Sequence, residues 1–269
     1  MSGLAPPSLS RIAQILADQA PTGQTSKGTV ADALASRAPT PSSGTDHRAR
    51  IAALVASKKR KVYFAFDFED IMRVNNVRNS WKITHPSSDE MRNFYDRSIW
   101  TQSRAHTDDG LKALMTRGVK YSSAVCVLVG TDTWRSRWVK YEIARAVVDE
   151  RGLVAVHING LAHSHRQAPD PLGFNPLRLM GVYHDPNGSY FLYELRVEIK
   201  NVQTGELAWA WRPYEDFKTA VPLPRNMTSM PSGYCTPLSQ CSIEHDYVAD
   251  AGHASIGTWT DNAAIAVGR

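Results

Sequence analysis

Residues 124–143, AVCVLVGTDTWRSRWVKYEI, predict a buried strand, a polar turn and a helix in direct succession. The run Ala124–Val129 contains only apolar side chains, which is typical of a strand in a parallel sheet that is covered on both faces. After the polar turn, Ser136 is placed to cap a helix that continues to about Glu150. The expected buried stripe of this helix consists of Val139, Ile143, Ala146 and Val147. Trp138 and Glu142 lie four residues apart and share a different face of it.

The stretches around this unit repeat the alternation of strand and helix. We expect strands at 61–66, 94–100 and 153–158, and helices at 70–81 and 108–118. Apolar strands that are separated by helices predict an α/β fold with a parallel sheet.

The C-terminal part has a different pattern. Residues 190–202 and 206–211 alternate in polarity around Gln203-Thr204-Gly205, which predicts a β-hairpin. The proline-rich stretch 221–234 is expected to be irregular, and residues 256–267 are expected to form a closing helix.

Residues 1–58 differ from the rest in composition, because all 24 aromatic residues of the chain follow residue 62. A segment rich in Ala, Ser, Thr and Pro buries little apolar surface, so we interpret it as a low-complexity arm. A helix that binds a partner is the alternative for this segment. We expect residues 59–165 to form the main domain and residues 166–269 to form an extension packed on it.

Charge and cysteine content exclude several classes of protein. With 31 Lys+Arg against 26 Asp+Glu, the net charge of +5 is too small to indicate a nucleic-acid-binding protein. No apolar run approaches the roughly 20 residues of a membrane span.

Three cysteines and no signal-peptide pattern indicate a reducing compartment, and we expect a cytoplasmic location. Whether Cys235 and Cys241 pair stays open.

Polar residues follow the expected strands, where parallel sheets bind ligands. Asp67, Glu69 and Asp70 are either metal ligands or acids that begin a helix, and we expect no metal. Arg73, Arg78 and Arg104 either meet phosphates or form a solvated face. The sequence has no Walker loop and no GxGxxG, GxSxG or HExxH motif.

Taken together, these stretches resemble the TIR-like family of the Thoeris anti-phage defence system, the ThsB-like family, over residues 60–269. The resemblance implies a flavodoxin-like, TIR-type parallel sheet with helices on both faces, followed by the hairpin-containing extension. The blocks that carry it are KVYFAFDFED (61–70), VNNVRNSW (74–81), AVCVLVG (124–130), TWRSRWVKYEI (133–143), GLVAVHIN (152–159), GFNP (173–176), WRPYED (211–216), DYVAD (246–250) and residues 259–269.

The resemblance also implies a chemistry, the cleavage of NAD. It places the catalytic carboxylate of TIR NAD-cleaving enzymes on Glu142, after Ser136 and Trp138. NAD is then the substrate, with no separate cofactor and no metal. The residues expected to contact the dinucleotide are Phe66, Asp67, Trp100, Arg104, Trp134, Ser136 and Trp138.

Partners follow from the same resemblance. An ADP-ribose-derived messenger would act on a downstream effector, and a phage-derived trigger would activate a homo-oligomer in which the loop with Arg104 and His106 completes the site. No nucleic acid or membrane partner is expected. Two alternatives stay open, namely a non-catalytic TIR-like interaction module and an enzyme similar to nucleoside deoxyribosyltransferases.

Overall fold

The computed structural model describes residues 60–84, 107–162, 168–201 and 206–269. Lys59–Arg269 form one compact unit, which contains two four-stranded sheets. The strand expected at 94–100 and the loop residues Trp100, Arg104 and His106 lie outside the described residues.

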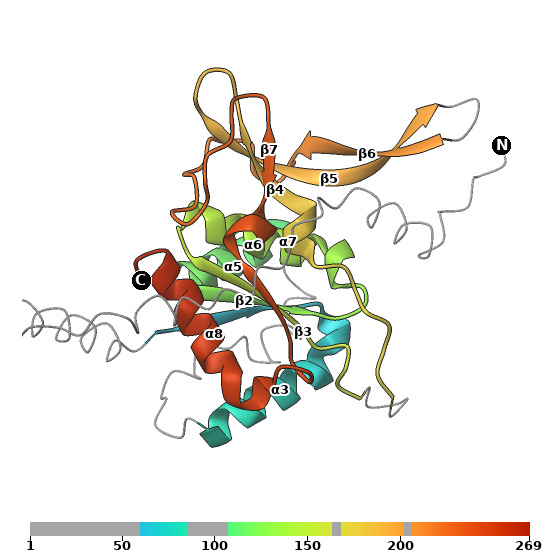
Figure 1. The fold of residues 1–269 in the computed structure, drawn as a ribbon, viewed down its shortest axis with the longest axis vertical. Helices are drawn as coiled ribbons and strands as arrows, with labels where there is room; N and C mark the ends of the chain where they lie inside the picture. The colour runs from blue at the N-terminus through green and yellow to red at the C-terminus, as the bar shows by residue number, and fades with distance from the viewer. Residues whose placement is uncertain (1–59, 85–106, 163–167, 202–205) are drawn as a thin grey trace, which may run out of the picture. The chain divides into compact units, whose positions relative to one another are not determined.

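The first sheet is parallel and confirms the expected α/β class (Figure 1). Its strand order is β1-β2-β3-β8, with every neighbouring pair parallel. Its strands are β1 (Val62–Ala65), β2 (Ala124–Val129), β3 (Gly152–His157) and β8 (Ile243–Asp246). The sequence predicted the first three of these strands but not β8.

Helices cover both faces of this sheet, as expected. On one face, α3 (Ile71–Thr84) packs beside α8 (Gly252–Ala266), and α8 also contacts β2 and β3. On the other face lie α5 (Asp108–Lys120) and α6 (Arg137–Val148). The predicted stripe of α6 is buried, with Val139, Ile143, Ala146 and Val147 each at most 2% exposed.

Strand side chains alternate between the two faces, as the two-residue period of a strand requires. Phe64 and Phe66 of the β1 stretch enter the core on the α3 and α8 side, whereas Tyr63 and Ala65 enter the core on the α6 side. This alternation decides which side chains of the first strand reach α6.

The second sheet is antiparallel and has the order β6-β5-β4-β7 (Figure 1). Its strands are β4 (Met180–His184), β5 (Tyr190–Asn201), β6 (Glu206–Pro213) and β7 (Cys235–Pro237). The predicted hairpin is confirmed as β5 and β6, whereas β4 and β7 were not predicted. Met180, Val182 and Leu192 join the core on the α6 side.

Short helical turns connect these elements. They are the 3-10 helices η2 (Phe68–Asp70), η4 (Thr133–Arg135) and η5 (Leu238–Cys241) and the single-turn helix α7 (Pro176–Leu179). Residues 214–234 contain no helix or strand, in agreement with the irregular stretch expected at 221–234.

Residues 166–269 contribute to both sheets. They supply the whole antiparallel sheet, and they also supply β8 and α8 to the parallel one. Within the described ranges, no helix combines the length and the apolar character that crossing a bilayer requires.

Candidate active site

Glu142 is a buried carboxyl in the second turn of α6, and only 4% of it is exposed. The phenol of Tyr63 in β1 donates a 2.5 Å hydrogen bond to its Oε1 atom. Burial raises the pKa of Glu142 to about 8, and the hydrogen bond from Tyr63 opposes that rise. A buried acid whose pKa lies near neutral pH is typical of functional sites.

The residues before Glu142 place the indole of Trp138 in the first turn of α6. Trp138 is partly buried, and the Arg137 guanidinium lies 5.0 Å from the centre of its ring. Ser136 occupies the N-cap position, as predicted, but its side chain makes no capping hydrogen bond. The hydroxyl is therefore not committed to the helix backbone.

Trp134 lies in η4, between the end of β2 and the start of α6. Its indole packs edge-on against Phe174 with ring centres 5.6 Å apart, and Arg135 lies 4.7 Å from its ring. The indole Nε1 atom is buried, and it has no hydrogen-bond acceptor in the part of the chain that the structure describes. A buried donor without an acceptor is costly, so this N–H suits a ligand acceptor.

A pocket of about 250 Å³ opens where β1 and β2 end. This is the edge of a parallel sheet at which ligands bind. Its lining carries five carboxylates against one guanidinium, which suits a cationic group better than a phosphate. The lining residues are Asp67, Glu69, Asp70, Arg73, Thr131, Asp132, Asp170 and Pro171.

Arg73 is the cation of this pocket, and it is only 3% exposed. Its guanidinium donates to Asp70 Oδ1 at 2.5 Å, to a carboxylate oxygen of Asp170, and to the carbonyl oxygen of Leu161 at 3.0 Å. Arg73 therefore ties α3 to the chain after β3. Burial raises the pKa of Asp70, although Arg73 opposes this shift.

Gly130 directly follows β2 and lies against the carboxyl group of Asp70. A β-carbon at residue 130 would lie 1.9 Å from Asp70 Oδ2, so only glycine permits this approach. Within the described residues, no group of three or more His, Cys, Asp or Glu side chains has the arrangement of a metal site.

The structure separates the predicted site residues into two groups. Asp67 lines the pocket at the sheet edge, and it accepts a 3.1 Å hydrogen bond from the backbone N–H of Glu69. Glu142 is not part of that lining. Phe66, expected on the rim, lies in the core on the α3 side with 4% exposure, because its side chain points to the opposite face of the sheet from Tyr63.

Two of the three arginines with an open role are buried. Arg73 meets carboxylates, as described above, and Arg78 lies 5.3 Å from the centre of the Phe66 ring. Neither belongs to a solvated face. Arg104 lies outside the described residues.

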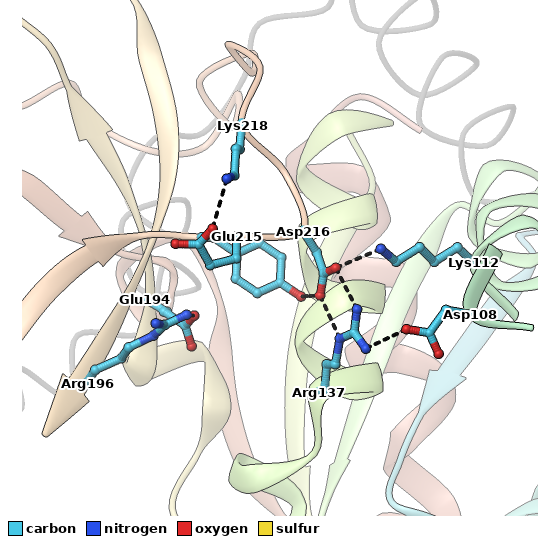
Figure 2. Close-up of polar contacts among 9 residues, drawn as sticks. Asp108, Lys112, Arg137, Glu194, Arg196, Glu215, Asp216 and Lys218 are labelled. Atoms are coloured by element: carbon cyan, nitrogen blue, oxygen red, sulfur yellow. Dashed lines mark hydrogen bonds and ion pairs between the residues drawn. The ribbon is translucent and has the colours of Figure 1, made fainter.

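A charged cluster at the start of α6 ties the helices to the segment after β6 (Figure 2). Arg137 donates to both oxygens of Asp216 at 2.9 Å and to Asp108 at 2.7 Å. Lys112 donates to Asp216 at 2.7 Å. The hydrogen bonds from Arg137 lower the pKa of Asp216, so this carboxylate stays ionised. The cluster fixes the helix turn that carries Trp138.

Sequence reasoning missed Tyr63 and Asp216 as partners of the site. The position of Tyr63 could have been predicted, because alternate residues of a strand face opposite sides of the sheet. Tyr63 and Phe66 therefore cannot both face α6. Asp216 had no such signal, since it lies 79 residues after Arg137 in an irregular segment.

Comparison with known proteins identifies a family model and a relative that this chain resembles. Residues 63–163 match the family model described as "Thoeris protein ThsB, TIR-like domain". A relative from Bacillus cereus (strain MSX-D12), named "Putative cyclic ADP-D-ribose synthase ThsB1", is 28% identical over 209 residues. The alignment covers 75% of this chain and 99% of the relative.

Proposed function

Because residues 63–163 form a TIR-like domain of the Thoeris ThsB type, we propose that this chain cleaves NAD with Glu142 as the catalytic carboxylate. The observation that carries the proposal is the buried carboxyl of Glu142, which follows Ser136 and Trp138 in α6 and is held by Tyr63. The relative's name, a cyclic ADP-D-ribose synthase, supports the same class of reaction.

The reaction needs one carboxylate. The bond between ribose C1′ and the nicotinamide nitrogen breaks, and its electron pair neutralises the positively charged ring, so nicotinamide leaves without being protonated. Positive charge then develops on the ribose, as in glycoside cleavage. Ionised Glu142 would offset that charge and hold the ribose hydroxyls.

Two outcomes follow from the same intermediate. If water adds to C1′ and loses a proton, the product is ADP-ribose. If a nitrogen of the adenine in the same molecule adds and loses a proton, the product is a cyclic isomer of ADP-ribose. We propose the cyclic product as a messenger to a downstream effector, on the strength of the relative's name.

The raised pKa of Glu142 implies two forms of the site, one with Glu142 protonated in the absence of substrate and one with Glu142 ionised when NAD is bound. With a pKa of about 8, the carboxyl is mostly protonated at pH 7. A cationic nicotinamide ring nearby would favour the carboxylate and lower this pKa. Substrate binding would thus favour the ionised carboxylate of Glu142, which is the form that the reaction needs.

The test is incubation with NAD, followed by chromatographic identification of nicotinamide and the ADP-ribose products. Wild type is compared with Glu142→Gln and with Glu215→Gln, a matched change at an exposed glutamate that pairs with Lys218. We expect nicotinamide release to fall roughly 100- to 1000-fold in Glu142→Gln only. Equal turnover by both variants would contradict the assignment of Glu142.

The same assay separates the alternatives. Deoxynucleosides are included as competing substrates, because base exchange between them would indicate a deoxyribosyltransferase-like enzyme. The protein is also assayed in the presence of a lysate of phage-infected cells. If it cleaves neither NAD nor deoxynucleosides even then, the non-catalytic interaction module is favoured.

A further inference from the structure

A second pocket of about 200 Å³ lies at the opposite edge of the parallel sheet, where β3 and β8 begin. It is bounded by the last turns of α8 and by the chain that leads into β8. Its lining residues are Leu153, Val154, Asn226, Gln240, Cys241, Ser242, Ile243, Trp259, Asn262, Ala263 and Ala266. None of them belongs to the lining of the carboxyl-edge pocket or to the surroundings of Glu142.

The lining combines one indole, an apolar floor and three primary amides. His245 stacks on Trp259 with ring centres 4.0 Å apart and so holds the indole in place. The amide of Asn226 is committed to the carbonyl oxygen of Cys241 at 2.6 Å. Gln240 and Asn262 make no side-chain hydrogen bond to any residue in the described ranges, and both are exposed.

Free amides and an indole select a particular kind of ligand. Each primary amide offers both donors and an acceptor without a charge. Together with an aromatic ring, they suit a flat, neutral ring that carries ring nitrogens and an amino group, such as a nucleobase.

A narrow cleft adjoins this pocket and shares Leu153, Asn226 and Cys241 with it. Its volume of about 10 Å³ holds roughly one water molecule. A larger group would therefore sit at its mouth rather than inside. Its lining carries two cations, Arg151 and Arg225, against one carboxylate, Glu150, so the mouth has a net positive charge.

Of the two arginines at this cleft, Arg151 is the one without a hydrogen bond or ion pair in the described part of the chain. Its Nε atom is buried. Arg225, by contrast, is held by Glu150 at 3.0 Å. Burial lowers the pKa of Arg151 and nearby Arg269 adds to the effect, whereas the charges of Asp149 and Glu150 oppose it. An anion beside Arg151 would relieve both penalties.

We propose that this edge of the sheet binds a nucleoside monophosphate, with the base against Trp259, Gln240 and Asn262 and the phosphate at Arg151. The pocket volume is below the roughly 300 Å³ of the smallest common drug-sized sites, so it suits one base and its sugar rather than a dinucleotide. The site is separate from the proposed catalytic site and does not depend on it.

The test is calorimetric titration of the full chain with AMP, with adenosine and with inorganic phosphate. We expect AMP to bind more tightly than adenosine. Arg151→Gln should weaken AMP binding roughly 10-fold or more, the scale of one charge-assisted contact, and leave adenosine binding unchanged. Asn262→Leu should weaken the binding of both ligands. Arg117→Gln, at an exposed arginine of α5, is the matched control and should change neither.

Glu142→Gln separates this site from the proposed catalytic one. AMP affinity that is unchanged in Glu142→Gln and reduced in Arg151→Gln supports the proposal. Absence of AMP binding at millimolar concentration overturns it, and so does AMP affinity that is lost in Glu142→Gln but kept in Arg151→Gln. Melting curves of each variant, read beside the control, identify any loss of fold.

Discussion

The phenol of Tyr63, in the first strand, donates to the carboxyl of Glu142, 79 residues later in the chain. The contact joins β1, the first strand in the order of the described parallel sheet, to the helix that carries the proposed catalytic group. The hydrogen bond lowers the pKa of Glu142, against the burial that raises it to about 8. Tyr63 is therefore a positioning residue for the carboxylate, and its role can be measured.

Tyr63→Phe should raise the pKa of Glu142 above about 8, because the hydrogen bond that favours the ionised form is lost. One such bond is worth roughly 1–2 pKa units, so nicotinamide release at pH 7 should fall about 10-fold. Activity should recover toward the wild-type value as the pH rises through 9. A pH–rate profile measures this shift.

Tyr141→Phe is the matched control for that profile. Tyr141 lies beside Glu142 in α6, but its hydroxyl pairs with Thr116 at 3.1 Å. Its profile should coincide with that of the wild type. A Tyr63→Phe variant that loses activity equally at every pH would show that Tyr63 acts on the fold and not on the ionisation of Glu142.

Glu142→Gln should make the protein more stable at pH 7 while removing its activity. A group whose folded pKa is raised contributes stability that is fully present below its unfolded pKa of 4.5 and is lost as the pH rises through about 8. At pH 7 this loss amounts to about 3 kcal/mol at most. Thermal melts from pH 5 to pH 8 should show wild type losing stability relative to Glu142→Gln, with Glu215→Gln parallel to wild type. Parallel curves for all three proteins would mean that Glu142 has an ordinary pKa.

Trp138→Ala should reduce both stability and NAD cleavage, whereas Trp138→Phe should keep much of both. The ring is only partly buried, so the cost in unfolding free energy should fall below the roughly 3–5 kcal/mol of a buried aromatic. Melting curves and NAD turnover are measured for both variants. Normal turnover by a destabilised Trp138→Ala would assign Trp138 a structural role alone.

Asp216→Asn should loosen the segment after β6 from α5 and α6, because Asp216 is bound by Arg137 and Lys112. Half of Arg137 is exposed, so we expect a cost of only about 1 kcal/mol at pH 7. Arg137 lowers the pKa of Asp216, so this stability is present above the unfolded value of 3.8 and is lost as the pH falls below it. The difference in melting temperature should therefore shrink below pH 3.8. A difference that is unchanged at low pH would exclude the ion pairs as its cause.

Removal of residues 1–58 should leave folding and chemistry intact, because Lys59–Arg269 form one compact unit. The chain from Lys59 onward should melt at the same temperature and cleave NAD under any condition in which the full chain does. Insolubility of the shortened chain would instead indicate that residues 1–58 cover part of it.

Three strands of the parallel sheet were predictable from the sequence, namely β1, β2 and β3, and β8 was not. Ala124–Val129 is an unbroken apolar run, and β2 has the predicted bounds. The strand β8 reads IEHD, and Ile243 is 59% exposed. Every side chain of β8 is exposed or half-buried, so the hydrophobic pattern that marks a strand is missing from its sequence.

For the candidate site, the sequence predicted relationships between residues that are close in the chain, but not contacts between distant ones. The four-residue spacing of Trp138 and Glu142 placed them on one helix face, and the motif singled out Glu142. Burial of Glu142 by Tyr63 depends on how α6 lies on β1, which no local pattern encodes. For the same reason the contact between Arg73 and Asp170, 97 residues apart, could not be foreseen.

The position of β8 and α8 has a consequence for biosynthesis. Both elements follow residue 242, yet β8 pairs with β3, and α8 covers β2 and β3. During translation the ribosome must pass residue 266 before this sheet has β8 and the helix that joins α3 on one of its faces. A chain that stops before residue 243 lacks both elements, so β3 has no β8 to pair with and the side of β2 and β3 that α8 covers is left open.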